Sequence, residues 1–255
     1  MMSTWSILKK IAGNKARELG NMLSGGKEPE RIDRNLPLGL RFGALVVIPE
    51  TDFILGADNG LKVICPKGKG IVTAYGTFKL SPFVIHRFYL TFEDDQVYML
   101  QVVLGEDGEI EECKLLMPWD EVYPPDDDDE AKAFWDYWLS EKDGYIGYSV
   151  FQSNDKTLYS RTWEHTGPGV VVAKGEDDSV IDRKPPVNFT ETLYLDRFGQ
   201  KTERVEYTGM MYGRQVNDDV DEYLLVAVIE DSEGAAVRLQ VGIDLNSEAL
   251  KLTVF

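Results

Sequence analysis

The sequence predicts a mainly β protein, α+β overall, with two antiparallel β-barrel or sandwich-like subdomains, one central helix and an N-terminal amphipathic helix. Three observations predict this fold. Apolar residues recur in short alternating runs, which is typical of strands with one solvated face. Turns rich in Gly, Pro and Asp separate these runs at the spacing of a meander. Two further segments have helical periodicity instead.

The first 27 residues are basic, although the chain as a whole is acidic. They contain five Lys or Arg and one Glu, and the net charge of the whole chain is −17, so residues 28–255 carry −21. On a helix, the apolar residues of this segment would share one face, as in a helix that lies in a membrane interface. That face would contain Trp5, Leu8, Ile11, Ala12, Leu19, Met22 and Leu23.

This basic head, residues 1–27, is expected to contact an anionic membrane or a partner helix. The expected contact residues are Trp5, Leu8, Lys9, Lys10, Ile11 and Lys15. The apolar members would insert, and each lysine near an anionic leaflet would contribute about 1 kcal/mol. Two alternatives stay open: the apolar face packs on the protein's own core, or the segment is disordered. Gly13 and Asn14 are poor helix formers, so the helix would be marginal in isolation.

The rest of the chain divides by composition into a linker and two β-rich parts. A polar linker is expected at 28–35. The first subdomain, 36–150, contains the expected strands FILG and LKVIC and ends in the helix 129–141. The second subdomain, 151–255, carries a long loop near 166–186 that is rich in Gly, Asp and Pro. One continuous barrel or sandwich is the alternative to two subdomains.

The helix expected at 129–141 has acidic residues in its first turn, where the helix dipole favours them. Its buried face is expected to contain Ala131, Phe134, Trp135, Trp138 and Leu139. The run Asp126–Asp129 therefore indicates a helix start rather than a calcium site, because four adjacent acids cannot all point at one ion.

Few residues suggest metal or nucleophilic chemistry. His86 and His165, the two histidines, are expected in structural or exposed positions. Cys65 and Cys113 belong to no CxxC or Cys/His grouping, so buried free thiols in a reducing compartment are expected. The sequence has no GxSxG elbow and no Walker loop. We therefore expect no enzyme activity, no cofactor and no metal.

Single arginines in apolar strands have a structural explanation. Arg87, Arg161 and Arg214 are expected to form ion pairs with some of the surplus acids. The acidic body also argues against nucleic acid as a partner, because phosphate binding requires a basic surface.

The order of several segments resembles that of the YjfK-like bacterial proteins, a family of unknown function. The segments include LPLGLR (36–41), HRFYL (86–90), YSRTWE (159–164), PPVNFTE (185–191), MMYGRQV (210–216), EYLLVAV (222–228) and VGIDL (241–245). The resemblance covers the chain from about residue 36 and leaves the head outside. It implies a gene context with a phage-shock-protein-A-like stress protein, a small membrane protein or ion channel, and an enzyme similar to glutathionylspermidine synthase.

The charge division, the amphipathic head and the lack of a catalytic signature favour a non-enzymatic accessory or interaction protein. The family resemblance implies that it acts at the cytoplasmic face of the inner membrane, in a phage-shock-like system. The expected partner is a phage-shock-protein-A-like protein or an anionic membrane surface. No stretch has the length of a membrane-spanning helix and no secretory signal is visible, so the expected location is cytoplasmic.

The alternative function is binding of, or catalysis on, a small cationic ligand such as a polyamine, for which an acidic surface is suited. A pocket lined by acids and aromatic rings would favour this alternative, because such a pocket can hold an ammonium group.

Overall fold

The computed structural model describes residues 30–163, 171–174, 180–232 and 234–254. The expected contact residues of the head lie outside the described residues; they are Trp5, Leu8, Lys9, Lys10, Ile11 and Lys15.

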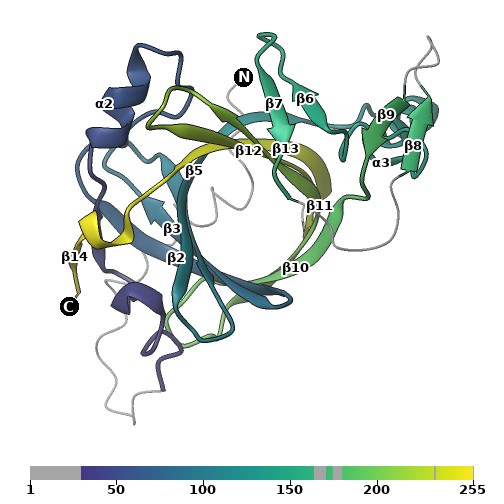
Figure 1. Ribbon diagram of the computed structural model, residues 1–255. Coiled ribbons are helices and arrows are strands. Elements are labelled where there is room, and N and C mark those ends of the chain that lie inside the picture. The colour runs from purple at the N-terminus through teal and green to yellow at the C-terminus, as the bar shows by residue number, and fades with distance from the viewer. Residues whose placement is uncertain (1–29, 164–170, 175–179, 233, 255) are drawn as a thin grey trace.

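Eight strands in the described part of the chain close into an antiparallel barrel, which Figure 1 shows end-on. They are β2 (Gly70–Leu80), β3 (Phe83–Thr91), β4 (Val97–Leu104), β5 (Ile110–Val122), β10 (Val187–Tyr194), β11 (Thr202–Gln215), β12 (Asp221–Asp231) and β13 (Gly234–Asp244). The order around the barrel is β2-β3-β4-β5-β13-β12-β11-β10, and β10 closes the ring by pairing with β2. The prediction of a mainly β protein is therefore confirmed.

The barrel contains strands from both halves of the chain. β13 pairs with β5, and β10 pairs with β2. The strands expected in the subdomains 36–150 and 151–255 therefore share one closed sheet, which is the alternative of a continuous barrel. The sequence does not reveal this arrangement, because strand pairing across more than a hundred residues leaves no local pattern.

Further elements lie outside the ring on two sides (Figure 1). On one side are η2 (Pro37–Gly39), β1 (Leu45–Val47), α2 (Thr51–Ala57), η3 (Ser247–Ala249) and β14 (Lys251–Thr253). On the other are α3 (Asp128–Leu139), β6 (Val150–Gln152), β7 (Leu158–Arg161) and the separate hairpin of β8 (Val171–Lys174) and β9 (Val180–Arg183). β1 pairs with β2, and β7 pairs with β11, so both groups are attached to the barrel.

The lumen of the barrel holds a buried ion pair among aromatic rings. Arg87 on β3 donates from Nη1 to Glu191 on β10 at 2.9 Å, and both side chains are fully buried. The guanidinium carbon of Arg87 also lies 4.9 Å from the ring centre of Tyr207 on β11. Because β3 and β11 are three strands apart on the ring, these side chains can meet only if they point inward.

The outer face of the barrel is buried as well. One hydrophobic cluster joins outward-facing residues such as Leu100 and Val226 to residues of the covering elements, among them Phe53 of α2 and Trp138 of α3. Seven of the eight residues of β4 are consequently buried. The expectation of strands with one solvated face is wrong for this strand, because an outer layer covers the side that a bare barrel would expose to water.

The helix predicted at 129–141 is confirmed as α3, with bounds Asp128–Leu139. Asp127 caps it, since its carboxylate accepts hydrogen bonds from the backbone N–H groups of Asp129 and Glu130. The indication of a helix start in the acidic run is therefore confirmed. Among the described residues, no helix is both long and apolar enough to pass through a bilayer.

Three local predictions differ from the structure. The expected strand FILG lies in α2, where Phe53 and Gly56 are buried at a spacing of three residues. The expected strand LKVIC, residues 61–65, is an irregular segment with a bend at Val63 and is not a strand. Within the expected loop 166–186, the described residues include β8 and β9. The helix was missed because it is only seven residues long.

Removing the carboxylate of Glu191 should destabilise the barrel strongly. Glu191→Ala leaves the buried Arg87 without its ion-pair partner, and breaking one side of a buried pair costs about 3–5 kcal/mol. Chemical denaturation measures the free energy of unfolding. The control is Glu206→Ala on β11, whose pair with Arg204 is exposed and should contribute less than about 1 kcal/mol. Similar losses for both variants would contradict the role given to the buried pair.

Candidate functional site

A pocket of about 370 Å³ opens on the outer side of the barrel, between α3, the end of β5 and the turn that joins β6 to β7. We call it the aromatic pocket. Its aromatic lining consists of Trp119, Tyr137, Trp138, Tyr145 and Phe151. Its polar lining includes Asp120, Gln152, Ser153, Asn154 and Asp155.

The first wall of the pocket is the C-terminal end of α3 and the chain that follows it. After the helix the chain folds back, so that the backbone N–H of Tyr145 donates to the carbonyl of Tyr137 at 2.8 Å. This return brings the ring of Tyr145 to 5.8 Å from Trp138 and 4.9 Å from Phe151, measured between ring centres. Trp138 and Phe151 are buried, whereas Tyr137 is 57% exposed at the rim. The wall is thus a continuous aromatic surface.

The second wall is the end of β5, where the strand has an irregularity. Asp120 pairs with Leu239 of β13, and Pro118 pairs with the next residue, Gln240, so Trp119 has no partner across the ladder. This is a β-bulge, which changes the direction of the side chains that follow it. The bulge places both Trp119 and Asp120 at the pocket.

The third wall is the turn between β6 and β7. The backbone N–H of Ser153 donates to the carbonyl of Thr157 at 2.9 Å, and Lys156 has a left-handed backbone with φ of 68°. Asn154 and Asp155 therefore lie at the tip of a tight hairpin. The Asn154 amide donates to the Oδ2 atom of Asp120 at 3.4 Å, so this tip touches the end of β5.

The two carboxylates of the pocket have different partners. Asp120 accepts a hydrogen bond from the backbone N–H of Glu121 at 2.9 Å and forms no ion pair with any Lys or Arg of the described residues. Asp155 accepts hydrogen bonds from the Nζ of Lys62, from the Ser153 hydroxyl and from the backbone N–H of Thr157. These bonds, that of Lys62 first, hold the pKa of Asp155 well below its usual range. A ligand cation can therefore reach Asp120 without displacing a described Lys or Arg side chain, whereas at Asp155 it would have to displace Lys62.

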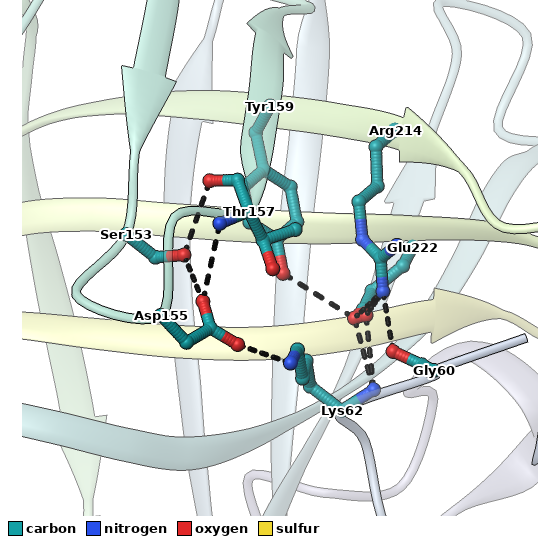
Figure 2. Close-up of polar contacts among 8 residues, drawn as sticks. All are labelled: Gly60, Lys62, Ser153, Asp155, Thr157, Tyr159, Arg214 and Glu222. Atoms are coloured by element: carbon teal, nitrogen blue, oxygen red, sulfur yellow. Dashed lines mark hydrogen bonds and ion pairs between the residues drawn. The ribbon is translucent and has the colours of Figure 1, made fainter.

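A buried glutamate holds Lys62 beside the pocket (Figure 2). The backbone N–H of Lys62 lies 3.0 and 3.1 Å from the two carboxylate oxygens of Glu222, whose side chain is fully buried. Arg214 donates from Nη2 to Glu222 at 3.0 Å and to the carbonyl of Gly60 at 2.7 Å. Tyr159 also donates to Glu222, at 3.4 Å, and burial raises the pKa of this tyrosine. The segment 60–62 is therefore fixed to β11, β12 and β7.

The chemistry of the aromatic pocket fits a cation. Aromatic faces attract ammonium and guanidinium groups, and a carboxylate supplies the opposite charge. The hydroxyl of Ser153 donates to Asp155 at 2.6 Å, so it acts as a support for the carboxylate. The pocket thus has the aromatic rings and the carboxylates that bind a cation, and its lining contains neither His nor Cys.

The arginines identified in the sequence are paired as expected. Arg87 pairs with Glu191, and Arg161 pairs with Asp182 at 3.0 Å. Arg214 pairs with Glu222 at 3.0 Å. Each of these ion pairs joins segments that lie apart in the sequence, except the last, which spans the β11–β12 hairpin.

The other residues singled out in the sequence lie away from the pocket. His86 accepts or donates a hydrogen bond at Nδ1 with the hydroxyl of Tyr75 at 2.7 Å, and burial lowers its pKa. His165 lies outside the described residues. Cys65 and Cys113 are free thiols, and only Cys113 is fully buried, with a pKa raised by that burial to about 12.

Sequence reasoning missed the pocket, although part of its signal was visible. Trp138 was assigned to the buried face of a helix, and the structure confirms that it is buried. Tyr137 in the same helix and Tyr145 shortly after it add two more aromatic residues to this segment of the sequence. Trp119, Asp120 and Asp155 could not be connected with these rings, because only the closed barrel and the bulge in β5 bring them together.

The chain matches a family model, DUF2491, described as a protein of unknown function, over residues 8–251. It therefore belongs to this uncharacterised family. No curated protein and no solved structure matches it. The match begins at residue 8 and so includes most of the basic head, which the resemblance had left outside. The name YjfK-like stays a prediction.

Removing the carboxylate of Glu222 should release the segment 60–62. Glu222→Ala deletes the acceptor of the Lys62 N–H, and hydrogen bonds to charged groups are worth about 1.5–3 kcal/mol. Hydrogen exchange of the Lys62 amide should therefore accelerate at least about tenfold. Glu230→Ala, an exposed acid on the same strand, is the control and should leave exchange at Lys62 unchanged. Unchanged protection in Glu222→Ala would contradict the anchoring role of this residue.

Proposed function

We propose that this member of the DUF2491 family is a binding protein for a small organic cation, such as a polyamine, and that the aromatic pocket is its site. The observation that carries the proposal is the position of Asp120 and its lack of an ion-pair partner among the described residues. This carboxylate lies in a pocket with five aromatic side chains and forms no ion pair with the described Lys and Arg residues.

Three physical terms support binding of a cation there. An ammonium group against an aromatic face gains about 0.5–2 kcal/mol, depending on its desolvation. A hydrogen bond from that ammonium to a carboxylate is charge-assisted and stronger than a neutral one. The net charge of −21 on residues 28–255 also raises the local concentration of cations around the protein.

The pocket favours binding over catalysis. A serine hydroxyl acts as a nucleophile when a base such as histidine activates it. The hydroxyl of Ser153 donates to Asp155 instead, and the pocket lining contains no histidine. We propose that the cation is bound without covalent change, in keeping with the expectation of a non-enzymatic accessory protein.

A second proposal concerns the basic head, and its support is the charge division of the sequence. Residues 1–27 carry +4 and the remainder −21, so only the head suits an anionic surface. We propose that the head holds the protein at the cytoplasmic face of the inner membrane, on the lipid or on a phage-shock-protein-A-like partner. The family match from residue 8 supports a role for the head that is shared by the family. The two proposals are compatible, because they use different parts of the chain.

Titration with spermidine tests the cation site. We expect isothermal titration calorimetry to show binding that weakens with salt, and Asp120→Asn to lower the affinity about tenfold through loss of a charge-assisted hydrogen bond. The matched control is Asp218→Asn, an exposed acid in the β11–β12 turn that removes the same charge. If both variants lose affinity equally, net charge and not the pocket governs binding, and the proposal is wrong.

Co-sedimentation with anionic vesicles tests the head. The triple variant Lys9→Glu, Lys10→Glu, Lys15→Glu should abolish association with vesicles, because it reverses the charge that meets the lipid. The control triple variant Lys69→Glu, Lys132→Glu, Lys142→Glu changes the total charge by the same amount on exposed body residues and should still bind. Vesicle binding that survives in the head variant at low salt would rule out the electrostatic contact.

A further inference from the structure

We propose that Lys62 is the protein's own competing cation at the aromatic pocket, and that it thereby selects ligands by their number of charged ends. A ligand with one ammonium group would use Asp120 and leave Lys62 in place. A ligand with two would have to displace Lys62 from Asp155. This inference rests on the proposed function of the pocket and adds to it a residue that determines specificity.

Lys62 reaches a pocket carboxylate from outside the pocket. Its Nζ forms an ion pair with Oδ2 of Asp155, and Asp155 lines the pocket, whereas Lys62 itself does not. Figure 2 shows its side chain extending from the segment 60–62 toward the β6–β7 turn. The ammonium group of Lys62 therefore occupies one of the two pocket carboxylates from outside the pocket.

The two carboxylates, Asp120 and Asp155, belong to one site. Asn154 connects them, since it precedes Asp155 in the chain and its amide donates to Asp120 at 3.4 Å. Both carboxylates line the same pocket. A linear diamine with one end at Asp120 can thus place its other end at Asp155, provided that Lys62 leaves.

The side chain of Lys62 can leave Asp155 without unfolding the segment 60–62 that carries it. The side chains of Lys62 and Asp155 are 29% and 40% exposed, and ion pairs with this much solvent contact contribute little net stability. The backbone N–H of Lys62 stays bound to the carboxylate of Glu222, at 3.0 and 3.1 Å. Displacement therefore requires only a rotation of the lysine side chain into water.

The arrangement gives a definite order of affinities. In the native protein a diamine gains the second carboxylate only by giving up the Lys62 pair, so its advantage over a monoamine is small. Without the charge at residue 62, the second carboxylate is open and the diamine gains a full charge-assisted contact. Removal of the lysine charge should therefore act on ligands with two charged ends and spare those with one.

The experiment compares 1-aminobutane with 1,4-diaminobutane by calorimetry on the full chain and its variants. Lys62→Met keeps most of the side-chain volume and should raise the affinity for the diamine about fivefold, with the monoamine affinity unchanged. Lys62→Arg keeps the charge and should behave as the native protein. Lys67→Met, an exposed lysine outside the pocket lining, is the control for total charge and should change neither affinity.

The outcomes separate the two proposals. Equal gains for both amines in Lys62→Met, or a diamine gain of the same size in Lys67→Met, would overturn the competing role of Lys62 and leave the cation site standing. No gain for either amine in a folded Lys62→Met protein that binds both would also overturn it. If neither amine binds the native protein or Lys62→Met, while the far-ultraviolet circular dichroism of both is unchanged, the cation site itself is wrong.

Discussion

The pairing of β10 with β2 closes the barrel, and it depends on the missing side chain at Gly76. Gly76 lies opposite Arg87 on one side and Leu193 on the other. A Cβ atom at this position would lie 1.7 Å from Oε1 of Glu191, so no larger residue fits while Glu191 reaches across the strand. The glycine therefore lets the carboxylate of β10 reach the guanidinium of β3, and this contact joins the two strands on either side of β2.

The outer layer follows from that closure. Because the lumen is filled by its own side chains, the apolar residues on the outer face need a cover, and the segments before, between and after the barrel strands supply it. One of these covers is the unit of α3 and the β6–β7 hairpin. Where this unit meets the bulge of β5, the packing leaves the aromatic pocket open. The pocket is thus a gap between the barrel and its cover. One of its carboxylates, Asp120, comes from the barrel strand β5, and the other, Asp155, comes from the β6–β7 turn of the cover.

Charge connects the pocket with the rest of the molecule. Several surplus acids are neutralised by arginines, as Glu191 is by Arg87 and Glu222 is by Arg214. Asp155 is neutralised by Lys62 at the edge of the pocket. Asp120 differs from Glu191, Glu222 and Asp155 because it forms no ion pair with a described Lys or Arg. It is therefore available to a ligand, whereas the other three carboxylates bind groups of the protein itself.

The sequence was informative wherever a feature is local. Helical spacing and the acidic first turn were sufficient to predict α3, and isolated arginines in apolar strands were sufficient to predict ion pairs for Arg87, Arg161 and Arg214. The single barrel was only an alternative, because the β5–β13 and β2–β10 pairings are long-range. The short helix α2 cannot be told from a strand by its pattern, because seven residues are too few to distinguish the helical period from the strand period. The pocket residues of β5 and of the β6–β7 turn could not be connected with α3 from the sequence, because their proximity also depends on long-range contacts.

The most direct test of this account is a backbone amide NMR titration of the isotope-labelled full chain with 1,4-diaminobutane. If a cation binds in the aromatic pocket, saturable shifts should centre on Asp120, Asn154, Asp155 and the indole N–H groups of Trp119 and Trp138. Saturable shifts elsewhere, or small changes spread over the acidic surface without saturation, would contradict a cation site in the aromatic pocket.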